Sequence, residues 1–492
     1  MKTGPSAFTE SAERPSPSPS SRSEGGAIRF ARSRQLGWAV LLGLFAIALV
    51  ARAGWGLWRE SRSPQPAALE FPDEVQYWNM AVSLHDGNGL RDELGFRATR
   101  MPLYPAFLSL FAGWEHGALA AKSAQWAVGA LVAPLTALLA HAFFSRRVAL
   151  LAGLWCAVDP FLVFFASLLL TETISITVLC ALWWIIARTH REERSTVPSP
   201  AFSRWLSIAG LAALCVYSRE STIGLAIVGM LFLALLTRSR ARNVAACALA
   251  ITSVVLTLVP WGVRNARVTG EWCWLTTRTG ISLYDGVGPS ATGASDLADV
   301  KQSPEVRSLG EHAWNRYFLS ESLRIIREDP ARVARLSLAK IARMWNPFPN
   351  VSTHQSRLER WVSAAWTLPT LGFAACGAVL LVGYRCRSMD GVHADSELQL
   401  ATGREPLVGK PPVAPVSRPL QVKEDRGAKL YALVLLLLPA VYFSALHALF
   451  VGSVRYRLAA MPMIEVLAAF AVVALVERVL GSNAAARGTC AT

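Results

Sequence analysis

The sequence is poor in charged residues, and acidic residues are the scarcer kind. Only 17% of its 492 residues are charged, with 34 Asp and Glu against 49 Lys and Arg, whereas 53% are hydrophobic. The apolar residues form blocks of roughly membrane-spanning length instead of alternating with polar residues. This pattern predicts an all-α polytopic membrane protein.

Patterns typical of metal sites and disulfide frameworks are missing as well. The histidines form no HExxH or comparable ligand pair, so no metal and no cofactor is expected. Of the eight cysteines, only Cys273 falls in an expected outer loop. The other seven fall in expected spans, at their inner ends or in the terminal tail: Cys156, Cys180, Cys215, Cys247, Cys376, Cys386 and Cys490. No disulfide framework or zinc spacing follows from this distribution.

The net charge of +15 raises the question of nucleic-acid binding. The Lys and Arg residues, however, lie mostly in short segments between apolar blocks, where basic residues orient a chain in the membrane. Nucleic acid is therefore not expected as a partner.

The N-terminal part of the chain predicts its orientation. Residues 1–36 are rich in Ser and Pro, carry several arginines and lack apolar periodicity, which is typical of a disordered cytoplasmic tail. The following apolar run, from Gly37 to Trp58, is too long for the core of a typical signal peptide and predicts a retained first span. The next segment, 59–101, is therefore expected to form the first outer loop.

About ten spans are expected in all, within a range of roughly nine to thirteen. The later ones lie near 118–144, 148–168, 171–188, 204–218, 221–237, 243–260, 362–384, 430–451 and 458–477. Arginines between the spans repeatedly fall on the predicted inner side, at 146–147, 188–204 and 238–242. The hairpins at Asp159-Pro160 and Ser218-Arg219-Glu220 are short, so the spans beside them could be re-entrant or merged.

These spans divide the chain into modules. An N-terminal transmembrane catalytic module is expected at 37–260, an exoplasmic loop at 261–361, a span at 362–384, a cytoplasmic linker at 385–429, a transmembrane hairpin at 430–478 and a tail at 479–492. Within the exoplasmic loop, 320–345 reads as a helix broken at Asp329-Pro330. Its second part is amphipathic and predicts an interfacial helix on the membrane, although a solvated helix in a small soluble domain has the same pattern.

This topology brings the unusual polar residues of the chain to its outer face. Ionisable groups near a membrane are costly unless they are paired, hydrated or used, so their convergence predicts one site there. Asp73 and Glu74, just beyond the first span, are the candidate catalytic residues. The candidate substrate-binding residues are Tyr77, Arg100, Glu172, Arg219, Arg264, Asn265, Tyr284, Arg455, Tyr456 and Arg457.

A carboxylate and several arginines at one membrane face suit the transfer of a sugar from a lipid phosphate. The carboxylate can take the proton of an attacking hydroxyl, while guanidinium groups stabilise the departing phosphate through charge-assisted hydrogen bonds. Taken singly, each residue also has an ordinary explanation: a solvated acidic pair, a helix cap or a headgroup anchor.

Several short motifs resemble membrane glycosyltransferases of the C-type (GT-C) fold, the branch that contains protein O-mannosyltransferases and lipid A aminoarabinose transferases. In order, the motifs are Pro72-Asp73-Glu74-Val75-Gln76-Tyr77, Gly87-Asn88-Gly89, Arg100-Met101-Pro102-Leu103-Tyr104-Pro105-Ala106-Phe107-Leu108, Leu170-Thr171-Glu172, Ser218-Arg219-Glu220, Pro260-Trp261-Gly262-Val263-Arg264-Asn265, Gly280 to Gly288 and Arg455-Tyr456-Arg457-Leu458. Their order and spacing cover most of residues 37–478.

The resemblance implies an inverting glycosyltransferase for a hexosyl or pentosyl group, with a polyprenyl-phosphate-linked donor and a hydroxyl acceptor on a protein, lipid or glycan. It implies that Asp73 is the general base with Glu74 as its companion, and that Arg264, Arg455 and Arg457 lie near the lipid phosphate. A bacterial inner membrane with the site facing the periplasm is expected. Two alternatives remain: a transporter or flippase for a lipid-linked anion, and an outer-leaflet glycan ligase.

Overall fold

The computed structural model describes residues 36–63, 69–194, 201–237, 239–297, 308–350, 355–383 and 426–489, and all regular structure within these ranges is helical. The predicted all-α class is therefore confirmed. The expected N-terminal tail and most of the expected 385–429 linker lie outside the described residues. The elements are α2 (Trp38–Arg62), α3 (Pro72–His85), α4 (Leu103–Ser109), α5 (Gly117–Ala130), α6 (Val132–Phe143), α7 (Arg146–Ala157), α8 (Pro160–Ala166), α9 (Glu172–Glu193), α10 (Ala201–Ser218), η1 (Glu220–Thr222), α11 (Ile223–Leu235), α12 (Arg240–Thr269), α13 (Thr279–Val287), α16 (Glu311–Glu328), α17 (Pro330–Met344), α18 (Arg357–Gly383), α20 (Arg426–Leu449), α21 (Val454–Arg457) and α22 (Met461–Thr489).

Six helical segments in the described part are long and apolar enough to cross a membrane: Trp38–Arg62, Gly117–Phe143, Glu172–Glu193, Arg240–Thr269, Arg357–Gly383 and Gly427–Leu449. The bent pair α7 and α8 adds a seventh if it forms one span. The helices α10 and α11 are apolar but shorter. The protein is thus an integral membrane protein, while the expected count of about ten spans stays a prediction.

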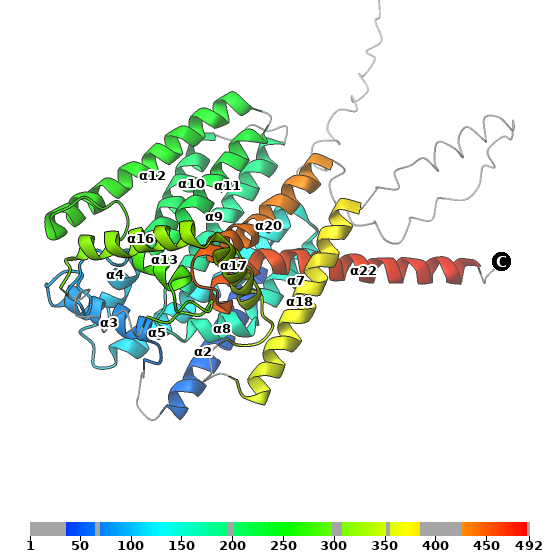
Figure 1. Cartoon of the computed structure of the whole chain (residues 1–492). Helices are drawn as coiled ribbons and strands as arrows, with labels where there is room; N and C mark the ends of the chain where they lie inside the picture. The colour runs from blue at the N-terminus through cyan, green and yellow to red at the C-terminus, as the bar shows by residue number, and fades with distance from the viewer. Residues whose placement is uncertain are drawn as a thin grey trace, which may run out of the picture.

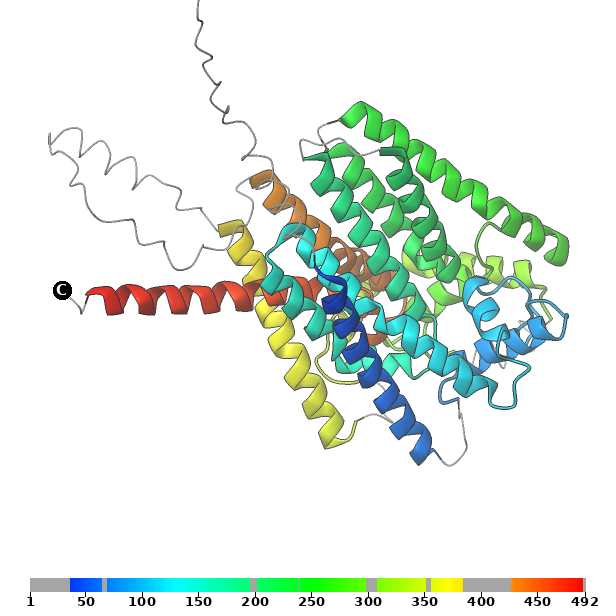
Figure 2. The ribbon, with the colours of Figure 1, turned by 180° about the vertical axis from the view of Figure 1, so that it is seen from behind.

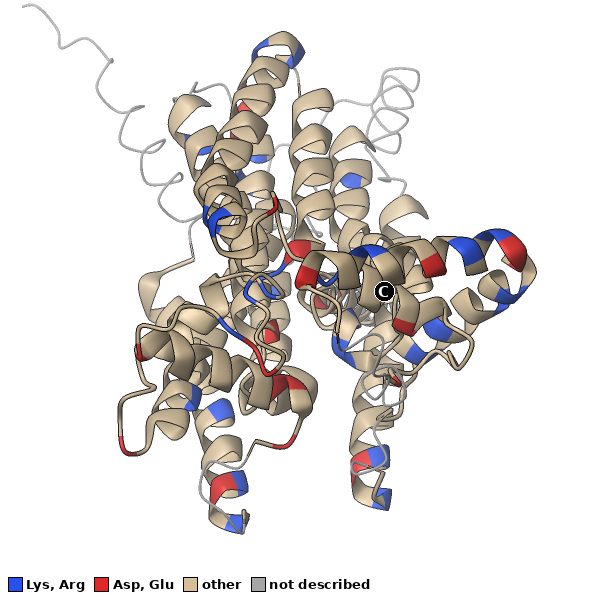
Figure 3. Cartoon of the chain, turned by 60° about the vertical axis from the view of Figure 1, so that its left-hand side comes forward, with Lys and Arg blue, Asp and Glu red and all other residues tan. Residues whose placement is uncertain are grey.

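The long helices form a bundle whose two ends differ (Figures 1 and 2). The C-terminal end of α2 and the N-terminal end of α18 lie at the lower end, near the short helices α3, α4 and α5. In Figure 3 the positions of Asp and Glu along the ribbon lie mostly in the middle and lower part of the view, and the long helices above them are mainly tan. The acidic residues are therefore concentrated toward one end of an apolar bundle.

The short hairpin at Asp159 is a broken helix, as the sequence suggested. The axes of α7 and α8 differ by 47°. Asp159 caps α8 by accepting hydrogen bonds from the backbone N–H groups of Phe161 and Leu162, and Pro160 occupies the first helical position. Arg52 of α2 donates to the carbonyl of Ala157 at the end of α7. These bonds satisfy the backbone groups that the break exposes in a buried region.

Helix α18 packs closely along α22. A Cβ atom at Gly377 would lie 2.2 Å from the carbonyl oxygen of Leu467, so only glycine allows the two backbones to approach this closely. The predicted helix in the exoplasmic loop is present as α16 and α17, and its predicted break falls at Asp329, whose side chain caps α17.

Candidate active site

A cavity of about 1590 Å³ lies among the segments that follow α2, the segments between α12 and α18, and the loop before α21. Its lining has a polar part and an apolar part, which are contributed by segments far apart in the sequence. The charged lining residues are Arg59, Asp73, Arg100, Arg219, Glu220, Arg278, Asp285, Arg343, Glu359 and Arg455.

Asp73 lies at the centre of the polar part, in the first turn of α3. Its Oδ1 accepts a hydrogen bond from Nη2 of Arg100 at 2.7 Å, and its Oδ2 accepts one from Nη1 of Arg455 at 2.7 Å. The side chain remains 31% exposed, toward the cavity. Pro72 begins the helix, because its fixed φ and missing N–H suit the first helical position.

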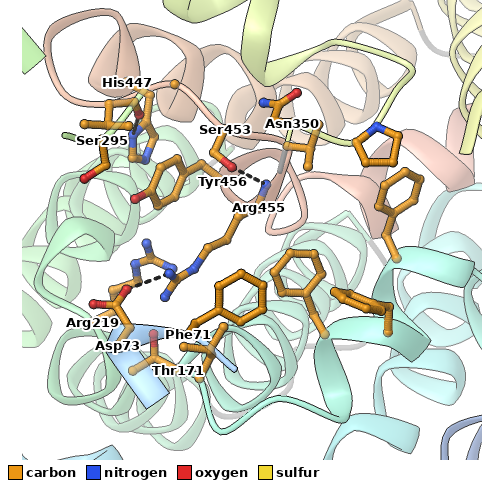
Figure 4. Close-up of a pocket in the computed structure, with 18 of the residues that line it drawn as sticks. Phe71, Asp73, Thr171, Arg219, Ser295, Asn350, His447, Ser453, Arg455 and Tyr456 are labelled. Carbon is orange, nitrogen blue, oxygen red and sulfur yellow. Dashed lines mark hydrogen bonds and ion pairs between the residues drawn. The ribbon is translucent and has the colours of Figure 1, made fainter. Parts of the chain in front are cut away.

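Arg455 joins Asp73 to a second, buried carboxylate. The guanidinium of Arg455 donates through Nε and Nη2 to Glu172, which is 2% exposed and also accepts from Arg219 at 2.7 Å. In Figure 4 the guanidinium groups of Arg219 and Arg455 converge beside Asp73. Glu172 does not line the main cavity, so it holds the two arginines from behind.

The local charge keeps Asp73 ionised. Burial opposes ionisation, but the guanidinium groups of Arg100, Arg455 and Arg278 outweigh it and hold the pKa of Asp73 well below its usual range. The polar part therefore presents an ionised carboxylate inside a group of arginines, which suits a ligand that brings additional negative charge.

The loop that carries Arg455 is held by α17. Lys340, which is fully buried, donates to the carbonyl oxygens of Ala448 and Leu449 at the end of α20. A Cβ atom at Gly452 would lie 2.3 Å from the carbonyl oxygen of Lys340, so the loop can pass this close to α17 only with glycine there. Ser453 then caps α21 by accepting a bond from the N–H of Arg455.

Six charged lining residues were not among the predicted site residues: Arg59, Glu220, Arg278, Asp285, Arg343 and Glu359. Arg278 donates through Nη1 to Oε1 of Gln76 at 3.2 Å, the same atom that accepts from Arg100. Arg343 donates through Nε to the carbonyl of Gly452 at 3.3 Å, and Glu220 begins η1 beside Arg219. Glu220 lies in a motif quoted above, whereas no sequence signal separates Arg278 or Arg343 from other loop arginines.

The apolar part of the cavity is built mainly by α2, α8 and α18. Its aromatic and aliphatic residues include Trp55, Trp58, Phe161, Val163, Phe164, Phe165, Leu358 and Val362. Trp58, Leu358 and Val362 line the cavity and are 46%, 73% and 47% exposed. The apolar part of the cavity therefore lies beside the ends of α2 and α18, which lie at the same end of the bundle in Figure 2.

Of the two predicted acids, Glu74 lies away from the cavity. Its carboxylate is fully buried and accepts hydrogen bonds from the backbone N–H groups of Glu70, Phe71 and Leu169 at 3.0, 3.1 and 2.7 Å. Burial raises the pKa of Glu74 despite these bonds. Through these bonds, Glu74 joins the start of α3 to the loop before α9.

Tyr77 and Tyr456 line the cavity as ring surfaces. The guanidinium of Arg100 lies 4.8 Å from the ring centre of Tyr77, and that of Arg219 lies 5.3 Å from the ring centre of Tyr456. Tyr456 also stacks on His447 with 3.8 Å between ring centres. Both tyrosines therefore support arginines of the site.

Arg264 and Asn265 do not line the cavity but support segments that do. Arg264 donates to the carbonyl of Arg97, and Asn265 donates to the carbonyl of Cys273 at 3.0 Å. Glu311, at the start of α16, joins the same two segments. Its carboxylate accepts from the backbone N–H groups of residues 97 and 98 at 2.8 Å and from the hydroxyl of residue 277. Residues 97–98 lie two to three positions before the cavity residue Arg100, and residue 277 directly precedes Arg278.

The remaining predicted residues, Tyr284 and Arg457, are also absent from the cavity lining. Tyr284 packs against Phe318 of α16 with ring centres 5.0 Å apart. Arg457 is fully buried and donates to the carbonyl of Asn346 at 2.6 Å and to the hydroxyl of Thr367 at 3.1 Å. Within the described ranges, no group of three or more His, Cys, Asp and Glu residues is arranged to hold a metal ion.

No protein-family model matches the sequence, and no curated protein matches it. Among solved structures, the chain is similar to the oligosaccharyltransferase AglB of Archaeoglobus fulgidus in complex with an inhibitory peptide and a dolichol-phosphate. The TM-score is 0.52 at 13% identity, over 92% of this chain and 51% of AglB. ArnT of Cupriavidus metallidurans, bound to undecaprenyl phosphate, gives 0.38 at 14% identity over 91% of this chain and 77% of ArnT.

The likeness to AglB confirms the predicted GT-C fold. The chain spans about half the length of AglB.

Proposed function

We propose that this protein is a glycosyltransferase that moves a sugar from a polyprenyl-phosphate donor to a hydroxyl acceptor at the outer face of the membrane. The observation that carries the proposal is the cavity itself, which combines an ionised carboxylate bound by two arginines with an apolar part. The GT-C fold supports it, as does the dolichol-phosphate found with AglB.

In the proposed reaction, Asp73 is the general base. It takes the proton of the acceptor hydroxyl, whose oxygen forms a bond to the anomeric carbon of the sugar while the bond from that carbon to the phosphate oxygen breaks. A single displacement of this kind inverts the anomeric centre. The electron pair leaves with the polyprenyl phosphate, which gains one negative charge as it departs.

Arg455 is the proposed ligand of the departing phosphate, with Arg219 beside it. Charge-assisted bonds from guanidinium groups stabilise a phosphate oxygen that gains charge. Glu172 holds both arginines in place before the phosphate arrives, which reduces the reorganisation needed during the reaction. The proposed role of Glu74 is to hold the start of α3, the helix that carries Asp73.

The apolar part of the cavity is the proposed place of the polyprenyl chain. Trp55, Phe164 and Val362 offer apolar surface beside the ends of α2 and α18, where we expect the lipid to enter from the bilayer. The acceptor hydroxyl then approaches Asp73 from the outer side. We place the protein in a bacterial inner membrane with this cavity facing the periplasm.

The test compares Asp73→Asn with the wild type in proteoliposomes. Undecaprenyl phosphates carrying mannose, glucose or 4-amino-4-deoxyarabinose serve as donors, a membrane extract supplies acceptors, and released undecaprenyl phosphate is measured. Removing a general base should lower the rate by roughly 10²- to 10⁴-fold. The control is Asp86→Asn, which changes an exposed aspartate at the end of the same helix.

The outcomes separate the proposed reaction from its alternatives. A rate near wild type in Asp73→Asn would remove Asp73 from the role of base. Movement of intact donor across the membrane without cleavage would instead indicate a flippase, and transfer of only multi-sugar donors would indicate a glycan ligase.

A further inference from the structure

Glu220 is a cavity-lining carboxylate that the proposed mechanism does not use. It is half-buried, follows Arg219 and begins the short helix η1. Within the described part of the chain, its carboxylate takes part in no hydrogen bond and no ion pair. Both oxygens of Asp73, in contrast, accept bonds from arginines. The cavity therefore contains one carboxylate that is engaged and one that is available.

The neighbours of Glu220 are mostly cationic. Its charge acts on Tyr77, Arg100 and Arg278, all of which also line the cavity. Arg278 uses Nη1 to bond Gln76, while its Nε and Nη2 have no partner among the described residues. An unengaged acceptor and unengaged donors thus line the same cavity, within range of each other's charge.

This pairing restricts the chemistry of the group that binds here. A phosphate would be repelled by the Glu220 carboxylate, and an isolated amine would be repelled by Arg100 and Arg278. A neutral group with several hydroxyls fits both partners, because each hydroxyl both donates and accepts a hydrogen bond.

We propose that Glu220 and Arg278 bind the hydroxyls of the sugar that is transferred, an inference that rests on the proposed function. Glu220 accepts hydrogen bonds from the sugar, and Arg278 donates to it. The phosphate of the donor binds elsewhere, at Arg455. Sugar recognition and phosphate recognition are therefore carried by different residues and can be separated by mutation.

The experiment measures binding of two kinds of lipid to purified protein in detergent. The first is bare undecaprenyl phosphate, and the second is undecaprenyl phosphate carrying mannose, glucose or 4-amino-4-deoxyarabinose. In the wild type, at least one sugar-bearing lipid should bind about tenfold or more tightly than the bare lipid, as expected for hydrogen bonds to a charged group. Glu220→Gln should abolish most of this difference and leave the affinity for the bare lipid unchanged.

Arg278→Lys provides a second variant, which should reduce the sugar-dependent difference because it loses the fork of guanidinium donors. Glu93→Gln is the matched control, since Glu93 is an exposed glutamate outside the cavity. Thermal unfolding of Glu220→Gln should match the wild type, because no bond to another residue is lost.

Three results would overturn the proposal: no sugar-bearing lipid binds better than the bare lipid, Glu220→Gln keeps the difference, or Glu220→Gln weakens both lipids equally. Failure of the wild type to bind bare undecaprenyl phosphate is a different result. It would contradict the proposed function itself.

Discussion

Asp73 and Glu74 are neighbours in the chain but have opposite surroundings. Successive residues of a helix point about 100° apart, so the two side chains leave α3 in different directions. Asp73 reaches the arginines of the cavity, whereas Glu74 reaches three backbone N–H groups. The sequence predicted an acidic pair at the site, but it contained no information on which partners each acid would meet.

The pKa shifts of Asp73 and Glu74 make the stability of the fold depend on pH in opposite ways. The pKa of Asp73 is lowered in the folded protein, so its ion pairs stabilise the fold above the ordinary pKa of aspartate, about 3.9, and this contribution is lost as pH falls through the lowered value. The pKa of Glu74 is raised, so its ionisation opposes folding, and protonation at acidic pH relieves that cost. Asp73 therefore stays ionised across neutral pH, ready to accept a proton.

Glu74→Gln separates a structural role from a catalytic one. An amide presents one N–H₂ group where the carboxylate presented an acceptor, so at least one buried backbone N–H loses its partner. The free energy of unfolding should fall by about 1–3 kcal/mol. Thermal unfolding in detergent measures this loss, and donor cleavage per folded molecule should fall much less than in Asp73→Asn.

Asp86→Asn is again the control, because Asp86 lies exposed at the other end of α3. If Glu74→Gln unfolds like the wild type yet abolishes donor cleavage, Glu74 acts in the chemistry and the structural explanation is wrong.

At the scale of elements, helix α16 holds segments 97–98 and 277 together, and we call it the brace of the site. Its first residue, Glu311, joins segments 97–98 and 277, and Asn315, one turn later, accepts a bond from the N–H of Gly280 at 2.7 Å. A Cβ atom at Gly280 would lie 2.1 Å from the carbonyl oxygen of Asn315, so α13 and α16 are in close contact there. The brace sets where Arg100 and Arg278 enter the cavity.

Glu311→Gln should therefore lower activity without touching the substrate. The glutamine has one oxygen for three donors, so the two segments separate slightly and their arginines move. A displacement of about 1 Å in a catalytic site can cost roughly 10²-fold in rate, and we expect a loss of this order or somewhat less. The measurement is the rate of donor cleavage, with bare undecaprenyl phosphate binding as the second readout.

Glu328→Gln, on the same helix, serves as the control, because Glu328 is 60% exposed and pairs only with Arg324 on the surface. Full activity in Glu311→Gln would show that Arg100 and Arg278 do not depend on the brace.

The extent of prediction from sequence differs between elements. Long apolar runs predicted most of the bundle, and Asp329-Pro330 predicted the break between α16 and α17, because these signals are local. The role of Glu311 was not predictable, since it depends on contacts across more than 200 positions. Arg264 was predicted to bind substrate, but it bonds the carbonyl of Arg97 and the side chain of Asn265 and does not line the cavity.

At the scale of the whole molecule, the distribution of basic residues predicts which end of the bundle faces outward. The C-terminal end of α9 and the N-terminal ends of α10 and α12, which carry basic residues, lie at the end opposite to α3 (Figure 1), so the positive-inside rule predicts that the cavity faces outward. A lipid-linked donor in the outer leaflet requires this orientation. The prediction can be tested with single cysteines at Glu93, near the cavity end, and at Arg240, at the other end.

For this test Cys273, Cys376, Cys386 and Cys490 are first replaced by serine, because the other four cysteines are buried and protected from reagents. A membrane-impermeant maleimide should label Glu93→Cys in intact spheroplasts and should label Arg240→Cys only after permeabilisation. The reverse pattern would place Asp73 in the cytoplasm. The donor would then have to be reached from the inner leaflet, and the periplasmic part of the proposed function would be wrong even if Asp73 and Arg455 still carry the chemistry.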